Sequence, residues 1–162
     1  MSTIERRSFE DIKRLVAENN VLALARSPDI DIKYKDHRVK VLEEWVSIED
    51  SVKVKYLGAL YLDQDGRKKA YFPDSSSRYA LAYNDFPYYI DESLDHYVLW
   101  ATHRLSPDEV EKILDEKIGL QPGTPEGSLG TSHERYWFEQ TVNFKSVKGV
   151  WHVHVFVYKL TV

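Results

Sequence analysis

The amino-acid sequence predicts an α+β protein with an N-terminal helical layer, followed by an antiparallel sheet with one inserted helix. Three observations support this fold class. Apolar residues recur at helical spacing before Gly58, aromatic and apolar segments separated by turn residues follow it, and one strongly capped helix start at Ser106 lies among the later strands. The pattern lacks a regular alternation of strand and helix, so a doubly wound parallel sheet is not expected.

Length and composition restrict the domain organisation. A chain of 162 residues with 43% hydrophobic residues is long enough to bury one core. We therefore expect a single domain over residues 1–162. Within it we expect a helical layer at 8–57 and a sheet-rich part at 58–162, which includes a helix at 106–118.

Charge, cysteine content and hydropathy restrict the partners. The net charge of −4 disfavours a nucleic-acid partner, and the absence of Cys excludes disulfides and thiolate metal sites. No segment approaches the roughly 20 apolar residues of a membrane-spanning helix, and the N-terminus lacks the apolar core of a signal peptide. We therefore expect a cytoplasmic protein with a small-molecule ligand and without a membrane partner. A homodimer is compatible with the sequence.

Capping residues and apolar spacing define the helices of the helical layer. Ser8 with Asp11 resembles a capping box, and the helix that follows is expected to end at Asn19-Asn20. A short apolar segment at 21–24 stops before Ser27-Pro28. The layer is completed by a helix over 29–48 with an apolar stripe (Ile32, Val39, Leu42, Trp45 and Val46) and a short helix over 47–56 that begins at Ser47 or Asp50. We expect these helices to pack on the sheet.

Turn residues and aromatic segments define the strands. Asp65-Gly66 between segments at 57–62 and 69–72 predicts a β-hairpin. Ser106-Pro107 predicts the start of the inserted helix, and a long loop is expected at 119–132. Further strands are predicted at 78–83, 97–100, 135–138 and 150–160.

The last strand contains the strongest functional signal. Side chains alternate between the two faces of a strand, so His152, His154 and Phe156 share one face, and Val153, Val155 and Val157 share the other. The valine face is typical of a core. Two neighbouring imidazoles on the opposite face indicate a nucleophile with its partner, an acid–base pair or two metal ligands. The alternative is an edge strand whose histidines are half exposed to solvent.

Several segments occur in an order that resembles a known family. They are Phe9-Glu10-Asp11-Ile12, 24–28, Asn84-Asp85-Phe86-Pro87-Tyr88, 96–100, Trp137-Phe138 with 145–147, and His152-Val153-His154-Val155. Together they resemble the N-acetylglucosamine-induced protein family, which carries a domain of unknown function, over residues 8–158. Tyr89 stands where a Gly is usual in that family, and His103 where a Lys is usual. The family name reports induction and supplies no reaction.

A second set of residues is similar to histidine-triad nucleotide-binding proteins. The set is Asn84, Pro87-Tyr88, His96, the helix start at 106–109, and a last strand with alternating histidines that follows Asn143, Ser146 and Gly149. In that superfamily the middle His of the triad attacks the α-phosphate of a nucleotide. The resemblance assigns His152 to the first position, His154 to the nucleophile and Phe156 to the third position. Phe at the third position offers no hydrogen bond.

These patterns predict a histidine-dependent small-molecule enzyme, a hydrolase or transferase that acts on a phosphorylated or nucleotide-type ligand. A neutral imidazole can displace a phosphoester leaving group and form a phosphoramidate. Arg104 or Arg135 would hold phosphate oxygens in a bidentate manner. The predicted catalytic residues are His154 and His152, and the predicted substrate-binding residues are Asn84, Asp85, His96, Trp100, Arg104 and Ser146.

Two alternatives stay open. The first is a metal-dependent enzyme with zinc or iron; otherwise the sequence favours no cofactor. The second is a non-catalytic small-molecule-binding module with Trp100, Trp137 and Trp151 as the walls of its pocket. The metal alternative uses His96, His152 and His154, with Asp85 as a further ligand.

Overall fold

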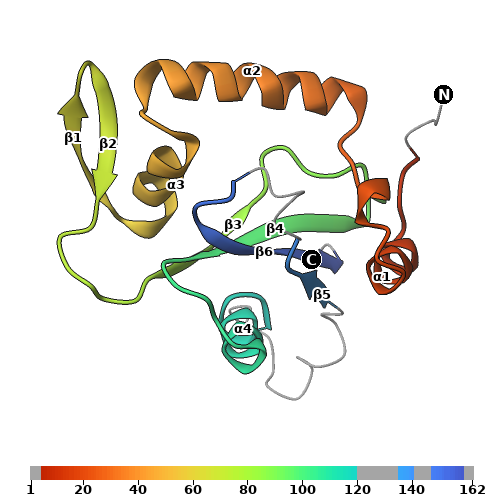
Figure 1. Ribbon diagram of the computed structural model, residues 1–162. Coiled ribbons are helices and arrows are strands. Elements are labelled where there is room, and N and C mark those ends of the chain that lie inside the picture. The colour runs from red at the N-terminus through yellow and green to blue at the C-terminus, as the bar shows by residue number, and fades with distance from the viewer. Residues whose placement is uncertain (1–4, 120–134, 141–146, 159–162) are drawn as a thin grey trace.

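Two antiparallel sheets and four α-helices form the described part of the fold in the computed structural model (Figure 1). The structure describes residues 5–119, 135–140 and 147–158. A four-stranded sheet has the strand order β3-β4-β6-β5, and a separate hairpin forms the two-stranded sheet β1-β2. The predicted α+β class is confirmed, but the strands form two sheets, because the hairpin pairs with itself and not with the later strands.

The helices begin at the predicted capping residues. Ser8 and Ser106 each form a complete capping box, with Asp11 and Glu109 respectively. Ser27 caps the second helix, and Ser47 caps the third by accepting from the Asp50 N–H. The helices are α1 (Phe9–Ala17), α2 (Pro28–Glu44), α3 (Ile48–Leu57) and α4 (Pro107–Leu114), with short helical turns at Val21–Ala23 and Asp115–Gly119.

The strands lie close to their predicted positions. The hairpin turns through Asp65 and Gly66, whose φ angles of 52° and 89° are typical of the tight turn that the Asp-Gly pair predicts. The last strand, β6, lies between β4 and β5, and His152 and His154 are 3% and 7% exposed. The alternative of a solvent-exposed edge strand is therefore wrong. The strands are β1 (Leu60–Gln64), β2 (Arg67–Tyr71), β3 (Tyr79–Tyr83), β4 (Leu94–Ala101), β5 (Arg135–Phe138) and β6 (Trp151–Tyr158).

Helix α2 departs from the prediction in its end and in its packing. It ends at Glu44, because Trp45 is extended and pairs with Lys68 of the hairpin. None of its residues is buried, and Ile32 and Val39 of the predicted apolar stripe are both 60% exposed. The stripe therefore does not pack on the sheet. Within the described ranges, no helix combines the length and the apolar character needed to cross a membrane.

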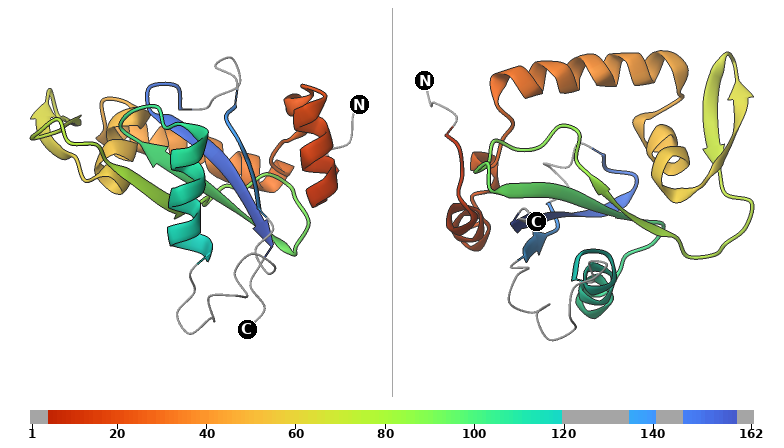
Figure 2. Two further views of the ribbon diagram at one scale, coloured as in Figure 1. Left: turned by 90° about the horizontal axis from the view of Figure 1, so that it is seen from below. Right: turned by 180° about the vertical axis from the view of Figure 1, so that it is seen from behind.

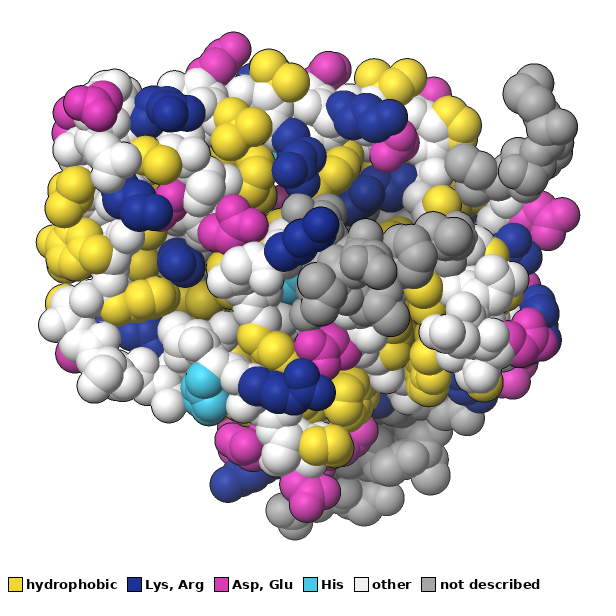
Figure 3. All heavy atoms as spheres, in the orientation of Figure 1, with side chains coloured by type: hydrophobic (Ala, Val, Ile, Leu, Met, Phe, Trp, Pro, Cys, Tyr) yellow, Lys and Arg dark blue, Asp and Glu magenta, His cyan; other side chains and the backbone are white. Residues whose placement is uncertain are grey.

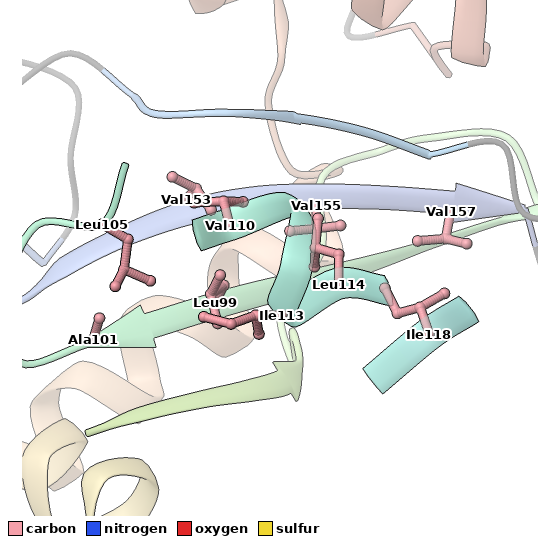
Figure 4. Packing of buried hydrophobic residues seen from close by; sticks show 10 residues of the cluster. All are labelled: Leu99, Ala101, Leu105, Val110, Ile113, Leu114, Ile118, Val153, Val155 and Val157. Atoms are coloured by element: carbon pink, nitrogen blue, oxygen red, sulfur yellow. The ribbon is translucent and has the colours of Figure 1, made fainter. Parts of the chain in front are cut away.

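One face of the four-stranded sheet packs against α4, as the valine pattern of the last strand predicts. Val153, Val155 and Val157 all point to this face (Figure 4). They meet Leu99 and Ala101 of β4 and the apolar side of α4, which contributes Val110, Ile113 and Leu114. This cluster is the largest of the three buried apolar clusters among the described residues.

The opposite face of the sheet is covered by α1 and α3, and α2 lies on the same side, away from α4 (Figures 1 and 2). Helix α1 packs against Phe156 and Phe138, and α3 packs against Val98 and Trp100. His152 and His154 also belong to this face of β6. Neither of the two apolar clusters includes them.

Asp50 connects α3 to the hairpin through a buried carboxylate. Its oxygens accept hydrogen bonds from the Ser47 hydroxyl at 2.5 Å and the Ala70 N–H at 2.9 Å, and Lys69 lies 3.5 Å away. Burial raises the pKa of Asp50, but the hydrogen bonds from Ser47 and Ala70 and the charge of Lys69 outweigh it and lower the pKa below its usual value.

We expect Asp50→Ala to destabilise the protein by about 1–3 kcal/mol at pH 7, because it leaves the buried Ala70 N–H without an acceptor. The pKa of Asp50 is lower in the folded state than in the unfolded state. The ionised carboxylate therefore adds to the free energy of unfolding above the unfolded-state pKa, and this contribution is lost as the pH falls through the folded-state pKa. Urea unfolding at pH 7 and pH 3 measures both effects, with Asp36→Ala on the exposed side of α2 as the control. Equal losses for the two variants at pH 7 would contradict this role of Asp50.

Candidate functional site

A cavity of about 110 Å³ lies between the histidine face of the sheet and the helices α2 and α3. Strands β4 and β6 provide Val98, Trp100, His152 and His154. Helix α2 provides Tyr34, His37 and Arg38, helix α3 provides Ser51, Lys55 and Tyr56 among others, and the segment after β3 provides Asn84, Asp85 and Phe86. Both predicted catalytic histidines therefore line one cavity.

A third histidine, His96, lies behind His154. It is fully buried, and its Nε2 atom is 2.9 Å from Nδ1 of His154. The β4–β6 register sets this contact, since His96 pairs with Phe156 and Val98 pairs with His154, which makes His96 the diagonal neighbour of His154. The backbone N–H of Tyr88 donates to Nδ1 of His96 at 3.2 Å.

These two hydrogen bonds assign the ring protons of His96 and His154. Because Nδ1 of His96 accepts from the Tyr88 N–H, the proton of neutral His96 is on Nε2 and is donated to Nδ1 of His154. Neutral His154 then has its own proton on Nε2, 3.5 Å from the Tyr88 hydroxyl. Burial, with a smaller contribution from the charge of Arg26, lowers the pKa of His96 to about 3. His96 is therefore neutral at physiological pH.

His152 has the opposite tautomer. Its Nδ1–H donates to the carbonyl oxygen of Val150 at 2.9 Å, so the Nε2 atom of the neutral ring has the lone pair. The ring lies against Trp100, with 4.6 Å between the ring centres, and Trp100 stacks on Tyr56. The cavity thus contains one imidazole with a donor Nε2 and one with an acceptor Nε2.

The cavity is positively charged although the chain has a net charge of −4. Its lining includes the cationic residues Arg26, Arg38 and Lys55. Asp85 is the only carboxylate among the described residues that line it. Asp85 forms an ion pair with Lys55 at 3.3 Å. Lys and Arg side chains gather below α2 near the middle of the face in Figure 3. Positive potential in a cleft attracts anionic ligands.

Several predicted substrate-binding residues meet at this cavity. Asn84, Asp85 and Trp100 line it, and His96 contacts it through His154. The Asn84 side chain also has a structural role, since its Oδ1 accepts from the Phe86 N–H at 2.8 Å and fixes the turn.

Other predicted residues lie elsewhere. Arg104 is not among the residues that line the cavity; it is an exposed side chain that pairs with Glu139 at 3.3 Å. Arg135 is held by Glu111 and Asp115, and thereby fastens β5 to α4. Neither arginine is a phosphate clamp of this cavity. Ser146 lies outside the described residues.

The alternative metal site is not formed by the predicted ligands. Both ring nitrogens of His96 are engaged, one with the Tyr88 N–H and the other with Nδ1 of His154, and Asp85 is exposed and paired with Lys55. Among the residues that the structure describes, no three His, Asp or Glu side chains lie together in a way that could hold a metal ion. In the described geometry His96, His152, His154 and Asp85 therefore do not converge as a ligand set, and the metal-dependent enzyme stays a prediction.

Comparison with known proteins identifies the family. The family model described as a protein of unknown function, DUF3605, matches residues 8–158. The chain belongs to the DUF3605 family. It is 26% identical over 156 residues to the uncharacterized protein YPL067C of Saccharomyces cerevisiae, an alignment that covers 93% of this chain and 78% of the yeast protein. The crystal structure of HTC1 has the same fold, with a TM-score of 0.61 and 22% identity over 95% of this chain and 86% of HTC1.

The cationic residues of this DUF3605 cavity escape prediction from the sequence. Tyr34 and Arg38 are four residues apart on α2, a spacing that places side chains on one side of a helix. That spacing is the sequence signal for a shared site. The apolar stripe on the same helix, however, predicts that the stripe faces the protein interior, whereas the stripe is exposed. His37, an exposed residue of the same helix, also lines the cavity and contacts the ring of Phe86.

Proposed function

We propose that this DUF3605 protein is a histidine-dependent enzyme that hydrolyses or transfers a phosphoryl group of a small, nucleotide-type ligand. One observation supports this proposal best. Two adjacent imidazoles with complementary roles, Nε2 of His152 as acceptor and Nε2–H of His154 as donor, line a positively charged cavity with aromatic walls.

His152 is the better candidate for the nucleophile. Its Nε2 lone pair attacks phosphorus and forms an N–P bond, while the P–O bond to the leaving group breaks and its electron pair leaves with that oxygen. Water then attacks phosphorus, the N–P electron pair returns to Nε2, and the proton of the water goes to solvent. In a transferase an acceptor hydroxyl replaces the water.

His154 is better suited to stabilise charge. Its Nε2–H can donate to a phosphoryl oxygen on which negative charge accumulates. As a nucleophile, His154 would need its proton on Nδ1, but this atom accepts the Nε2–H of His96. His96 cannot shift its own proton from Nε2 to Nδ1, because its Nδ1 accepts the Tyr88 N–H. The hydrogen bonds therefore favour exchanging the two roles that the sequence resemblance assigns.

A distant histidine-triad relationship is part of this proposal. The alternating histidines of an antiparallel β6 and the capped α4 favour it, and Phe156 at the third position argues for altered chemistry. A nucleotide-type ligand is supported by the aromatic lining of the cavity, to which Trp100 and Tyr56 contribute. A cytoplasmic location and induction by N-acetylglucosamine stay predictions from the sequence.

Trapping of the phosphoryl intermediate tests the proposal. The purified protein is incubated with a panel of nucleotides and sugar phosphates, and products and the intact protein mass are measured. We expect turnover, and an acid-labile phosphoryl adduct that His152→Ala abolishes. The His154→Ala variant should still form the adduct, but at least about 100-fold more slowly, as for removal of an oxyanion donor.

Three results would contradict this assignment. An adduct that forms on His152→Ala but not on His154→Ala would restore the roles that the sequence suggests. Turnover that persists in both variants would place the chemistry elsewhere. Ligands that raise the melting temperature without any turnover in the wild type would favour the non-catalytic binding module.

A further inference from the structure

We propose that Arg26 and Arg38 form an anion subsite around Tyr34 that takes the terminal phosphoryl group of a phosphomonoester and fastens helix α2 over the cavity. This inference rests on the proposed function for the identity of the cavity, but it concerns binding and does not require turnover. It assigns the ligand a dianionic end, which the histidine pair alone does not specify.

Arg26 is fixed in an orientation suited to binding an anion. Its Nε–H donates to the carbonyl oxygen of Phe86 at 2.9 Å, and its guanidinium carbon lies 3.8 Å from the centre of the Tyr34 ring. Within the described residues these contacts go to a carbonyl and a ring, and none goes to a carboxylate. A half-buried guanidinium without a neighbouring negative charge is costly, and an anionic ligand would offset that cost.

The charge of Arg26 acts on the histidine side of the cavity. It contributes to lowering the pKa of His96, and it also acts to lower the pKa of Tyr88, which burial raises overall. The Phe86 carbonyl that Arg26 binds is two residues before Tyr88, whose hydroxyl lies 3.5 Å from Nε2 of His154. A phosphoryl group bound by Arg26 would therefore lie on the same side of the cavity as the Nε2–H of His154.

Arg38 completes the subsite from the next turn of α2. It donates to the hydroxyl of Tyr34 at 2.9 Å, and its guanidinium carbon lies 5.7 Å from the ring centre. Two guanidinium groups that border one ring can together offer N–H donors to the oxygens of one phosphoryl group. Such an arrangement favours a dianionic monoester over a monoanionic diester, because two positive charges attract a dianion more strongly than a monoanion.

The packing of α2 suggests that an anion bound at the subsite would reduce local opening of this helix. The helix buries none of its residues, and Val46, just beyond its end, is joined to the hairpin by a hydrogen bond from its N–H to the Lys68 carbonyl oxygen at 2.9 Å. A segment with few buried apolar contacts opens locally at low free energy. An anion that joins Arg38 of α2 to Arg26, which precedes the helix, would add contacts along its inner side.

Binding of inorganic phosphate to the intact protein tests this inference. We expect saturable binding by calorimetry, and slower amide hydrogen exchange in α2 when phosphate is present. Arg26→Gln and Arg38→Gln should each weaken binding about 10- to 100-fold, the loss expected for charged hydrogen bonds. Lys35→Gln is the matched control, because it removes one positive charge from α2 at an exposed side chain outside the cavity, and it should bind phosphate within twofold of the wild type.

The possible outcomes separate the subsite from the proposed reaction. Failure of the wild type to bind phosphate, or an equal loss in Lys35→Gln, would overturn the subsite. Arg26→Lys, which keeps the charge, guards against a folding defect in Arg26→Gln and should bind phosphate better than the Gln variant. Phosphate binding and adduct formation are measured separately on the wild type. Absent turnover with intact phosphate binding would therefore overturn the reaction and leave the subsite standing.

Discussion

Lowering the pH from 7 to 4 is expected to reduce the free energy of unfolding by several kcal/mol, and we attribute a large share of this loss to His96. The ring is fully buried, and burial is the main cause that lowers its pKa to about 3 in the folded protein. An unfolded histidine titrates near pH 6.5. Between pH 6.5 and pH 3, His96 is therefore protonated in the unfolded state but neutral in the folded state.

The sign follows from proton linkage. Above about pH 6.5 His96 is neutral in both states and contributes no pH dependence. Below that pH the unfolded state gains stability relative to the folded state, by up to about 1.4 kcal/mol per pH unit. The loss continues until the pH approaches the folded pKa near 3. The carboxylates Asp11 and Asp50, whose pKa values are lowered, add losses at the acidic end of this range.

Urea unfolding of the wild type and His96→Gln at pH 7, 6, 5 and 4 isolates the share of His96. The Gln amide can donate to Nδ1 of His154 and accept from the Tyr88 N–H, yet it does not titrate. We expect this variant to be less stable at pH 7 and to lose less stability per pH unit between pH 6 and pH 4. His103→Gln, which removes an exposed imidazole, is the matched control. Identical slopes for wild type and His96→Gln would remove His96 as the cause.

The features that the sequence predicts well are set by local interactions. The capping boxes at Ser8 and Ser106 and the turn at Asp65-Gly66 depend on residues within three or four positions of one another. The two faces of β6 follow from strand geometry alone, so the separation of His154 from Val153 and Val155 needs no tertiary information.

The features that the sequence does not predict depend on contacts between distant segments. The hydrogen bond from His96 to His154 joins residues 58 positions apart and requires the β4–β6 register. The sequence places His96 in the site but does not predict which ring nitrogen of His96 carries the proton. Helix α2 has an apolar stripe and a polar side, and the sequence alone does not show that the polar side faces the cavity. Arg104 and Arg135 are near the site in the sequence pattern, but Glu139 and Glu111 hold them elsewhere.

Phe156→Ala is expected to destabilise the protein by about 3–5 kcal/mol, the usual cost of truncating a fully buried Phe. The ring is fully buried on the face that packs against α1. It stacks on His96, with ring centres 4.5 Å apart, and on Phe138 at 6.0 Å. Its loss should also loosen His96 and hence the tautomer of His154. Chemical denaturation at pH 7 measures the first effect, and nitrogen NMR shifts of the His154 ring measure the second.

A second substitution at this position separates packing from catalysis. Phe156→His creates the third histidine of the triad pattern, but the position is not among the residues that line the cavity. We expect it to destabilise the fold by about 1–3 kcal/mol, because it buries an imidazole among apolar rings, and to bring no gain in turnover. Val39→Ala, at an exposed position of α2, should cost less than about 0.5 kcal/mol. Since the ring at position 156 supports His96 from behind, a gain of activity in Phe156→His would mean that the third position reaches the ligand, and would overturn the structural role argued for Phe156.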